Sequence, residues 1–351
     1  MFHFDRGLKL TKADLAIDFR RRQPRGFISH AHNDHMARHQ LALCTPDTGR
    51  LYQHRLGKRA VYELPYRQPN DFGGIRLTTY PAGHCLGSAM LLAEDGEHSL
   101  LYTGDFKLRE SHTAERAEIP RADILVIEST FGDPRYRLIP RASAIAQLYE
   151  VVAAALADGA TPVIRAYTLG KSQEVTRLLT LEGFKVLQHR DIYAVSRVYE
   201  QCGVALGEYG LFAGKADAGE VVILPPHLNR DRPFQAAQRI VTIAVSGWAA
   251  VATSRRWLSA NHAIPLSDHA DYDELFECIE RVGARLVYCT HGPASFVDCL
   301  RAAGIAAQPL EAGQLTLGKH AVSAHDSPES RSATPQSFRT AHNRTQRALF
   351  D

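Results

Sequence analysis

The sequence lacks the features that mark membrane, secreted and disulfide-stapled proteins. No apolar run approaches the roughly 20 residues that a membrane-spanning helix needs. Residues 1–10 carry charged side chains and no apolar signal core. The six cysteines include no CxxC pair, which is typical of reduced thiols, several of them in the core. We therefore expect a cytoplasmic protein without a membrane partner.

The sequence also lacks a strong excess of charge of either sign. Its formal net charge is +3, which neither requires nor excludes a polyanionic partner, because local patches matter more than the sum. The hydrophobic fraction of 45% and the charged fraction of 23% are ordinary for a globular chain. The seventeen histidines are the unusual feature. Imidazole is the commonest metal ligand in proteins, so the arrangement of these histidines is informative.

Short apolar runs alternate with helical stretches along the chain, the pattern of a layered α/β protein. Helices are predicted over 141–157, 170–181 and 271–282, and another is predicted to end near residue 201. Strands are predicted over 26–28, 99–103, 123–127, 163–164, 184–187, 221–224, 241–245 and 286–289. From about residue 323 the chain has almost no large apolar residues, and we expect that tail to be disordered.

The strongest chemical signal is a histidine-rich segment at residues 29–35, which reads Ser-His-Ala-His-Asn-Asp-His. Side chains alternate along an extended segment, so His30 and His32 point the same way and can reach one ion. Asp34 and His35 follow on a turn and can face a second ion. A histidine-rich surface loop is the alternative, but the HxHxDH order is much more specific than two isolated histidines.

Two further polar residues stand where strands are predicted to end. His84 follows Gly83, and Asp105 follows Gly104. A glycine beside each residue allows a tight turn that brings the side chain close to an ion. Taken alone, His84 could be a turn histidine and Asp105 a cap or turn residue. Together with the first segment, both are predicted to be metal ligands.

In this order and context, His30, His32, Asp34, His35, His84 and Asp105 resemble the ligand set of the metallo-β-lactamase superfamily. Three later segments resemble the motifs of its β-CASP nuclease branch. Glu128 follows a strand, His269 lies in a Ser-Asp-His-Ala-Asp segment, and His291 ends a strand. The chain is most similar to bacterial DNA ligase-associated exonucleases. It is also similar to RNase J and to the endonuclease that processes mRNA 3′ ends.

The resemblance implies an α/β fold, an αββα sandwich interrupted by an inserted α/β domain. The metallo-β-lactamase domain would comprise residues 1–132 and 257–320, and the β-CASP domain residues 133–256. Residues 321–351 would form the disordered tail. Nucleic acid would enter the cleft between the two domains.

By the same resemblance, one zinc ion would be held by His30, His32, His84 and Asp105. The other would be held by Asp34, His35, Asp105 and His291, with Asp105 bridging the pair. Two ions about 3.5–4 Å apart can make a hydroxide available at neutral pH and offset charge on phosphate. Two Zn2+ are expected, and Mn2+ is the alternative because histidine and aspartate suit several divalent ions.

The remaining steps of phosphodiester hydrolysis are assigned to side chains near the metals. Asp34 would orient the attacking hydroxide, and His269 would be the general acid for the leaving oxygen. Glu128 would hydrogen-bond the other ring nitrogen of His269 and favour its protonated form. The predicted substrate-binding residues are Lys171, at a helix start, with Ser246 and Gly247. A surface lysine and a strand-end carboxylate are the alternatives for Lys171 and Glu128.

The predicted function is a two-metal nuclease, a DNA exonuclease of a ligase-associated repair system. The partners would be single-stranded DNA or RNA, with a DNA ligase and a helicase. RNA processing is the alternative, because within the branch a histidine at the position of His291 is associated with RNA-acting members. A small-molecule hydrolase would lack the inserted domain and the Glu128–His269 pair. An inactive scaffold subunit would have lost some of the ligands, all of which are present here.

Overall fold

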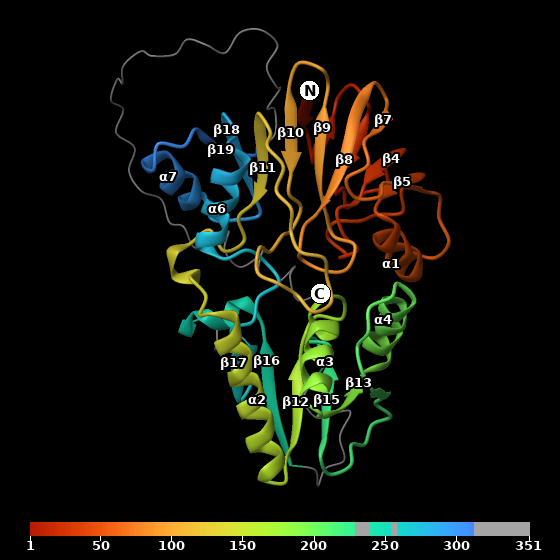
Figure 1. Ribbon diagram of the computed structural model, residues 1–351, viewed down its shortest axis with the longest axis vertical. Helices are drawn as coiled ribbons and strands as arrows, with labels where there is room; N and C mark the ends of the chain where they lie inside the picture. Colours follow the sequence, from red (N-terminus) through yellow and green to blue (C-terminus); the bar gives the residue numbers. More distant parts are fainter. Residues whose placement is uncertain (229–238, 254–257, 312–351) are drawn as a thin grey trace.

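The computed structural model describes residues 1–228, 239–253 and 258–311. The predicted mixed α/β class is confirmed: three β-sheets and six α-helices occupy the described part of the chain. Figure 1 shows two units, one above the other. We call the upper one, with two sheets and helices α1, α6 and α7, the double-sheet unit. The lower one, with the third sheet and helices α2, α3 and α4, is the single-sheet unit.

The first sheet of the double-sheet unit is built from the N-terminal part of the chain. Its outer pairs, β1 with β2 and β2 with β3, are antiparallel, whereas the pairs from β3 to β6 are parallel. In spatial order its strands are β1 (Phe2–Phe4), β2 (Leu8–Leu10), β3 (Leu15–Ile17), β4 (Arg25–Phe27), β5 (Leu41–Cys44) and β6 (Val61–Glu63).

The second sheet joins two distant parts of the sequence. Strands β7 to β10 form an antiparallel meander, and β10, β11, β18 and β19 are parallel. Its spatial order is β19 (Ala307–Pro309), β18 (Leu286–Thr290), β11 (Ile124–Glu128), β10 (Ser99–Tyr102), β9 (Ala89–Glu94), β8 (Ile75–Pro81) and β7 (Asn70–Phe72). The β11–β18 pair therefore places Glu128 opposite Thr290, beside His291.

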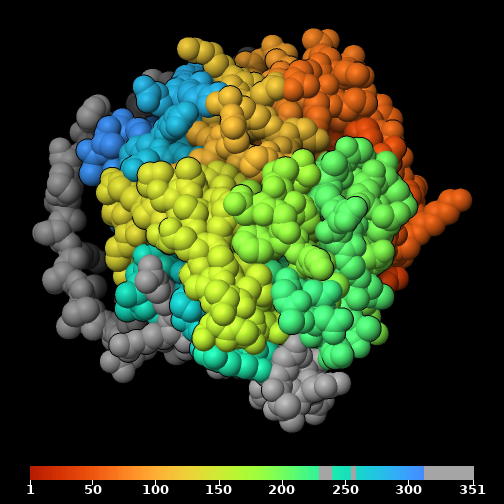
Figure 2. All heavy atoms as spheres, turned by 60° about the horizontal axis from the view of Figure 1, so that its bottom comes forward, coloured from red at the N-terminus to blue at the C-terminus, as the bar shows by residue number. Residues whose placement is uncertain are grey.

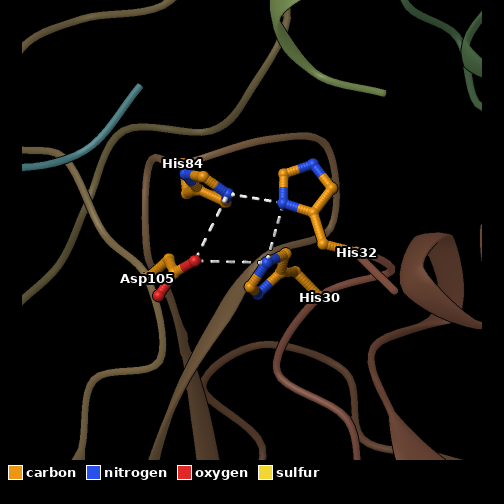
Figure 3. Close-up of side chains that lie close together, drawn as sticks. All are labelled: His30, His32, His84 and Asp105. Atoms are coloured by element: carbon orange, nitrogen blue, oxygen red, sulfur yellow. Dashed lines mark hydrogen bonds and ion pairs between the residues drawn. The ribbon is translucent and has the colours of Figure 1, made fainter. Parts of the chain in front are cut away.

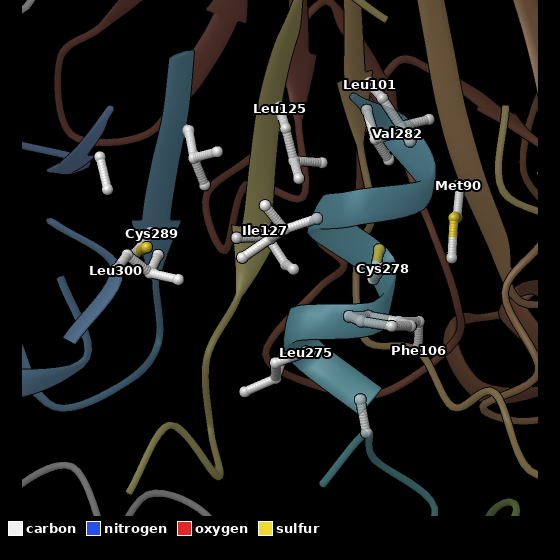
Figure 4. Close-up of a cluster of buried hydrophobic side chains, with 14 of the residues drawn as sticks. Met90, Leu101, Phe106, Leu125, Ile127, Leu275, Cys278, Val282, Cys289 and Leu300 are labelled. Carbon is white, nitrogen blue, oxygen red and sulfur yellow. The ribbon is translucent and has the colours of Figure 1, made fainter. Parts of the chain in front are cut away.

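The two faces of the second sheet bury different cores, because successive side chains of a strand point to opposite faces. Leu100 and Val126 face the first sheet and belong to the core between the sheets. Leu101 and Leu125 face the other way and pack against α6 (Tyr272–Val282) and α7 (Ala294–Ala302). Figure 4 shows this second core around α6.

Helix α1 (Pro46–Leu56) packs on the first sheet at β5 and β6. The side chain of Thr45 caps it by accepting a hydrogen bond from the Thr48 N–H, and Pro46 occupies the first turn, where no N–H is needed. Helix α6 begins with a capping box between Asp271 and Glu274. The layers of the double-sheet unit therefore run helix, sheet, sheet, helices.

The third sheet is entirely parallel, and its central strands are rich in buried valine and isoleucine, as expected for a sheet covered on both faces. Its spatial order is β14 (Tyr209–Leu211), β13 (Lys185–Gln188), β15 (Glu220–Leu224), β12 (Thr161–Arg165), β16 (Ile240–Val245) and β17 (His262–Ile264). The remaining helices are α2 (Arg141–Ala157), α3 (Lys171–Leu181) and α4 (Arg190–Gln201), with 3-10 turns η1 (Pro134–Tyr136) and η2 (Gly247–Ala250).

A separate apolar core joins the two units. It combines Leu51 and Tyr52 of α1 with Val195, Val198 and Tyr199 of α4. In Figure 2 the yellow and green atoms of the single-sheet unit lie directly against the orange and red atoms of the double-sheet unit.

The predicted helices and strands are found within one or two residues of their expected bounds, and the six cysteines are free thiols, four of them buried. Strand β17 belongs to the third sheet, although it lies beyond residue 256, where the sequence placed the end of the insert. The predicted disordered tail, 321–351, lies outside the described residues. Within the described ranges, no helix combines the length and the apolar character that crossing a membrane requires.

Candidate metal centre

Four side chains predicted to bind one ion converge at the base of the double-sheet unit. One ligand atom from each of His30, His32, His84 and Asp105 lies within 4.8 Å of all the others. His32 Nδ1 is 3.0 Å from His30 Nε2 and 3.2 Å from His84 Nε2. Asp105 Oδ2 is 3.5 Å from His30 Nε2 and 3.9 Å from His84 Nε2. Figure 3 shows the four side chains pointing toward one another.

Strand ends and glycine turns bring these residues together. His30 and His32 follow β4, and Asp105 and His84 follow β10 and β8. Gly104 has φ 55°, and a Cβ there would lie 2.7 Å from the Cβ of Ser29. A Cβ on Gly83, with φ 78°, would lie 2.2 Å from the carbonyl oxygen of Lys107. Both turns therefore require glycine, as the sequence predicted.

The second nitrogen of each imidazole has its own partner, which fixes the orientation of the ring. His30 Nδ1 lies 3.0 Å from Ser29 Oγ, and His84 Nδ1 lies 2.8 Å from the backbone oxygen of Asp268. His32 Nε2 lies 3.0 Å from the backbone oxygen of Leu169 in the single-sheet unit. Nε2 of His30 and His84 and Nδ1 of His32 are therefore left to face the centre.

The electrostatics of the three histidines suit metal binding. Burial lowers the pKa of His30 well below its usual value, and the neighbouring histidines lower it further. Burial also lowers the pKa of His32, and it lowers that of His84 to about 3. The neutral imidazole is the form that binds a metal. Three such nitrogens with one carboxylate are a donor set that fits Zn2+.

The residues expected to hold a second ion lie beside this group. His35 Nε2 is 3.3 Å from Asp105 Oδ2 and 3.7 Å from Asp34 Oδ2, and the rings of His35 and His291 are 5.6 Å apart. His291 has φ 61°, a left-handed conformation that is uncommon outside glycine and often found at functional sites. Among the described residues, the second set, Asp34, His35, Asp105 and His291, is less closely clustered than the first set, His30, His32, His84 and Asp105.

Sequence reasoning missed Asp18, which contacts both the histidine-rich segment 29–35 and Tyr102 at the end of β10. Its carboxylate accepts hydrogen bonds from the Ser29 N–H at 2.8 Å, the Ser29 hydroxyl at 2.6 Å and the Tyr102 hydroxyl at 2.8 Å. It also lies 2.8 Å from His35 Nδ1. Burial would lower the pKa of His35, but Asp105 and Asp18 outweigh burial and raise it well above its usual value. No motif in the sequence marks Asp18, since its partners are up to 84 residues away.

Glu128 and His269 form the pair that the sequence predicted. Nδ1 of His269 lies 3.1 and 3.0 Å from the two carboxylate oxygens of Glu128. Burial would lower the pKa of His269, but Glu128 and Asp105 outweigh it and raise the pKa to about 10. The carboxylate of Glu128 therefore favours the doubly protonated imidazole, the form that can donate a proton. The His269 ring lies 4.7 Å from that of His84.

A cleft of about 540 Å³ opens onto these groups between the two units. The double-sheet unit contributes His32, Asp34, Asp105 and His269 to its walls. Three of its other lining residues are those predicted to bind substrate, Lys171, Ser246 and Gly247. The hydroxyl of Ser246 accepts a hydrogen bond from the Trp248 N–H, and a Cβ on Gly247 would lie 2.6 Å from the ring of Phe131.

Lys171 is buried and already paired. Its Nζ lies 3.1 Å from Glu174 Oε2 and 3.9 Å from Asp268 Oδ1. The Glu174 carboxylate also accepts hydrogen bonds from Lys107 at 3.2 Å and Arg141 at 2.9 Å. Lys107 and Asp268 belong to the double-sheet unit and the others to the single-sheet unit, so this buried ionic cluster holds the two units together beside the metal centre.

Comparisons with known proteins find relatives that carry the names of nucleic-acid enzymes. Each of these relatives is much longer than the part that this chain matches. The chain is 39% identical over 323 residues to a protein of Opitutus terrae named "Probable DNA ligase", covering 90% of this chain and 32% of that protein. It is 32% identical over 146 residues to the Endoribonuclease YSH1 of Yarrowia lipolytica, covering 40% of this chain and 17% of that protein. The chain thus spans about a third or less of the length of these relatives. No protein-family model matches it.

Among solved structures, a protein of unknown function from Enterococcus faecalis V583 has a similar fold. The TM-score is 0.54 at 14% sequence identity, and the match covers 76% of this chain and 75% of that one. At this level of identity the match shows a similarity of fold alone, over about three quarters of the chain.

Proposed function

Because the chain belongs to the β-CASP branch of the metallo-β-lactamase superfamily, we propose that it is a metal-dependent nuclease that hydrolyses phosphodiester bonds in the cleft between its two units. The double-sheet unit would be the metallo-β-lactamase sandwich. The single-sheet unit would be the β-CASP insert. The layer order and the insertion of one unit into the chain of the other support this assignment.

One observation carries the proposal: four side chains that could hold a metal ion and His269, paired through Nδ1 with Glu128, belong to the same cleft region. His30, His32, His84 and Asp105 would hold one ion, and Asp34, His35 and His291, sharing Asp105, a second. Bound zinc or manganese would lower the pKa of water and offset charge on phosphate. A small-molecule hydrolase would need the metal cluster but not the Glu128–His269 pair.

The chain's own residues would supply the proton transfer. His269 would donate its Nε2 proton to the leaving oxygen, since its Nδ1 is occupied by Glu128. Asp34, with 30% of its side chain exposed at the cleft, would orient the attacking water. The ionic cluster around Glu174 would keep the two walls of the cleft in fixed positions relative to each other.

The relative named as a DNA ligase aligns with 90% of this chain, and that supports a role beside DNA ligation. We therefore propose single-stranded DNA as substrate and exonucleolytic trimming before ligation as the activity. His291 and the 32% identity to an endoribonuclease support RNA as the second candidate.

A direct test uses the purified protein with added Zn2+ or Mn2+ and matched single-stranded DNA and RNA oligonucleotides, labelled at the 5′ or the 3′ end. Release of mononucleotides from DNA is expected. The Asp34→Ala variant should release none, and the labelled end that disappears first gives the polarity. Cleavage of RNA alone would assign the protein to RNA processing. Cleavage of neither substrate by metal-loaded protein would overturn the proposal.

A further inference from the structure

One arginine lines the cleft, and Asp34 acts on its charge only from beyond ion-pair distance. Arg55 lines the cleft from the last turn of α1. Its Nη1 donates a hydrogen bond to the backbone oxygen of Ala31, and it takes part in none of the ion pairs found between residues 1–228, 239–253 and 258–311. Lys171, which also lines the cleft, is paired with Glu174.

The fold holds this side chain firmly against the metal centre. Ala31 lies between the ligands His30 and His32, so the hydrogen bond from Arg55 attaches the guanidinium to the ligand segment itself. The hydroxyl of Tyr52, three residues earlier on α1, donates to the backbone oxygen of Ala37 at 2.8 Å and anchors the helix on the other end of the same loop. Arg55 is therefore held by Ala31, the residue between the two proposed metal ligands His30 and His32.

The single-sheet unit also lines the cleft, and its helix α4 lies against α1. The lining residues of α4 are Asp191, Ala194 and Val195, and α1 and α4 pack together beneath. Phe131 and Trp248, whose rings pack against each other, also line the cleft.

An arginine in this state is suited to binding an anion. Burial lowers the pKa of Arg55, with Asp34 partly offsetting that effect, but a guanidinium stays charged at any ordinary pH. Taking a charge out of water without a partner costs free energy, and an incoming anion would recover that cost. One of the five N–H donors is used by Ala31, and the planar fork matches two oxygens of one phosphate.

We propose that Arg55 binds a backbone phosphate of the nucleic-acid strand next to the phosphate that is cleaved, and so sets the register of the strand at the metal centre. This inference rests on the proposed function, because it takes the ligand to be a phosphodiester chain. It makes Arg55 a substrate-positioning residue that supplies the free positive charge that Lys171, already paired, does not.

The test compares Arg55→Gln with Arg50→Gln, which changes an exposed arginine on the same helix that does not line the cleft. The affinity of metal-loaded protein is measured for a single-stranded oligonucleotide with phosphorothioate linkages, which keep their charge and resist cleavage. Salt is varied, because each phosphate contact contributes about 0.7 to the slope of log affinity against log salt for single strands. Metal content is measured for every variant.

Arg55→Gln is expected to bind about tenfold more weakly and to lower the slope by about 0.7, with wild-type metal content. KM for a cleavable oligonucleotide should rise more than kcat falls. Arg55→Lys should restore the slope but not the full affinity, because it keeps the charge and loses the fork. Arg50→Gln should match wild type.

Two results would overturn the inference alone. One is wild-type affinity and slope in Arg55→Gln. The other is a loss of bound metal that accounts for its lost binding, which would make the Ala31 hydrogen bond purely structural. If wild-type protein neither binds nor cleaves the oligonucleotides, the proposed function fails, and this inference fails with it.

Discussion

Nδ1 of His35 lies 2.8 Å from the carboxylate of Asp18, a residue that directly follows β3 and lies outside the histidine motif. Asp18 adopts φ 49°, a left-handed conformation that turns its carboxylate back toward residues 29 and 35. The same carboxylate accepts the Tyr102 hydroxyl. The histidine-rich loop is therefore oriented by a buried aspartate side chain from a neighbouring strand end.

Replacement of this carboxylate tests how far it tunes the centre. Asp18→Asn keeps the shape of the side chain. It removes the negative charge beside Nδ1 of His35, a charge that would make the imidazole a stronger metal ligand. We expect metal affinity to fall by about 10–100-fold, the usual effect of changing an outer partner of a ligand. Competition with a chelator of known affinity gives the measurement. Asp14→Asn, an exposed neighbour that also has positive φ, is the control and should bind metal normally.

A variant of His269 should distinguish an effect on catalysis from an effect on metal binding. His269→Ala should keep the metal content of wild type and lose cleavage by about 10²–10⁴-fold, because the residue acts on the leaving group. Metal analysis and initial rates on one preparation test both parts. His262→Ala removes an exposed histidine outside the cleft and should leave both unchanged. Full activity in His269→Ala would remove the residue from the mechanism.

The Glu128 carboxylate should set the alkaline limit of activity. Burial would lower the pKa of His269, but Glu128, with Asp105, raises it to about 10. The protonated form is present below this pKa and is lost as pH rises through it. Glu128→Gln removes the largest raising effect, so the alkaline limb of the pH–rate profile should move to lower pH. An unmoved limb at constant metal occupancy would show that another group controls it.

The same linkage affects stability. The folded pKa of His269 exceeds its usual value of 6.5, so its protonation stabilises the fold fully below about pH 6.5. That contribution is lost as pH rises toward 10. In Glu128→Gln the difference in unfolding free energy between pH 6 and pH 9 should therefore be smaller than in wild type, apart from the constant cost of the substitution.

The buried ionic cluster should be a large contributor to stability. Glu174 neutralises Lys107, Lys171 and Arg141, and the two lysines are almost completely buried. Glu174→Gln leaves these cations without their shared anion, and breaking a buried pair in this way costs about 3–5 kcal/mol. Urea unfolding measures the loss. Glu182→Gln, exposed at the end of α3, should change the free energy of unfolding by less than about 0.5 kcal/mol.

The sequence predicted those parts of the molecule that depend on local pattern. Helices α2, α3 and α6 have long periodic segments, and the clustered side chains of His30, His32, His84 and Asp105 stand in short motifs with glycine turns. Strands β1 to β3 have three residues each, too few for a periodic signal. Helix α1 was also missed, because proline and glycine within its first four residues are poor helix formers.

The features that escaped prediction depend on contacts between distant residues. Lys171 reads from sequence as a phosphate ligand at a helix start, yet in the fold its ammonium pairs with Glu174 and approaches Asp268, 97 positions later. Asp18 and Arg55 carry no motif, and they gain a role only because β3 and α1 pack against the histidine loop. No local pattern encodes such neighbours.

The central claim, that nuclease activity depends on metal held by this cluster, is tested most directly at Asp105. Bound metal is counted by mass spectrometry while single-stranded oligonucleotide cleavage is followed during stepwise metal addition to chelator-stripped protein. In wild type, cleavage should rise in proportion to bound metal. Asp105→Ala should lose both together, since its carboxylate contacts His30, His35 and His84. Undiminished cleavage by stripped wild type, or a full complement of metal in Asp105→Ala, would contradict the account.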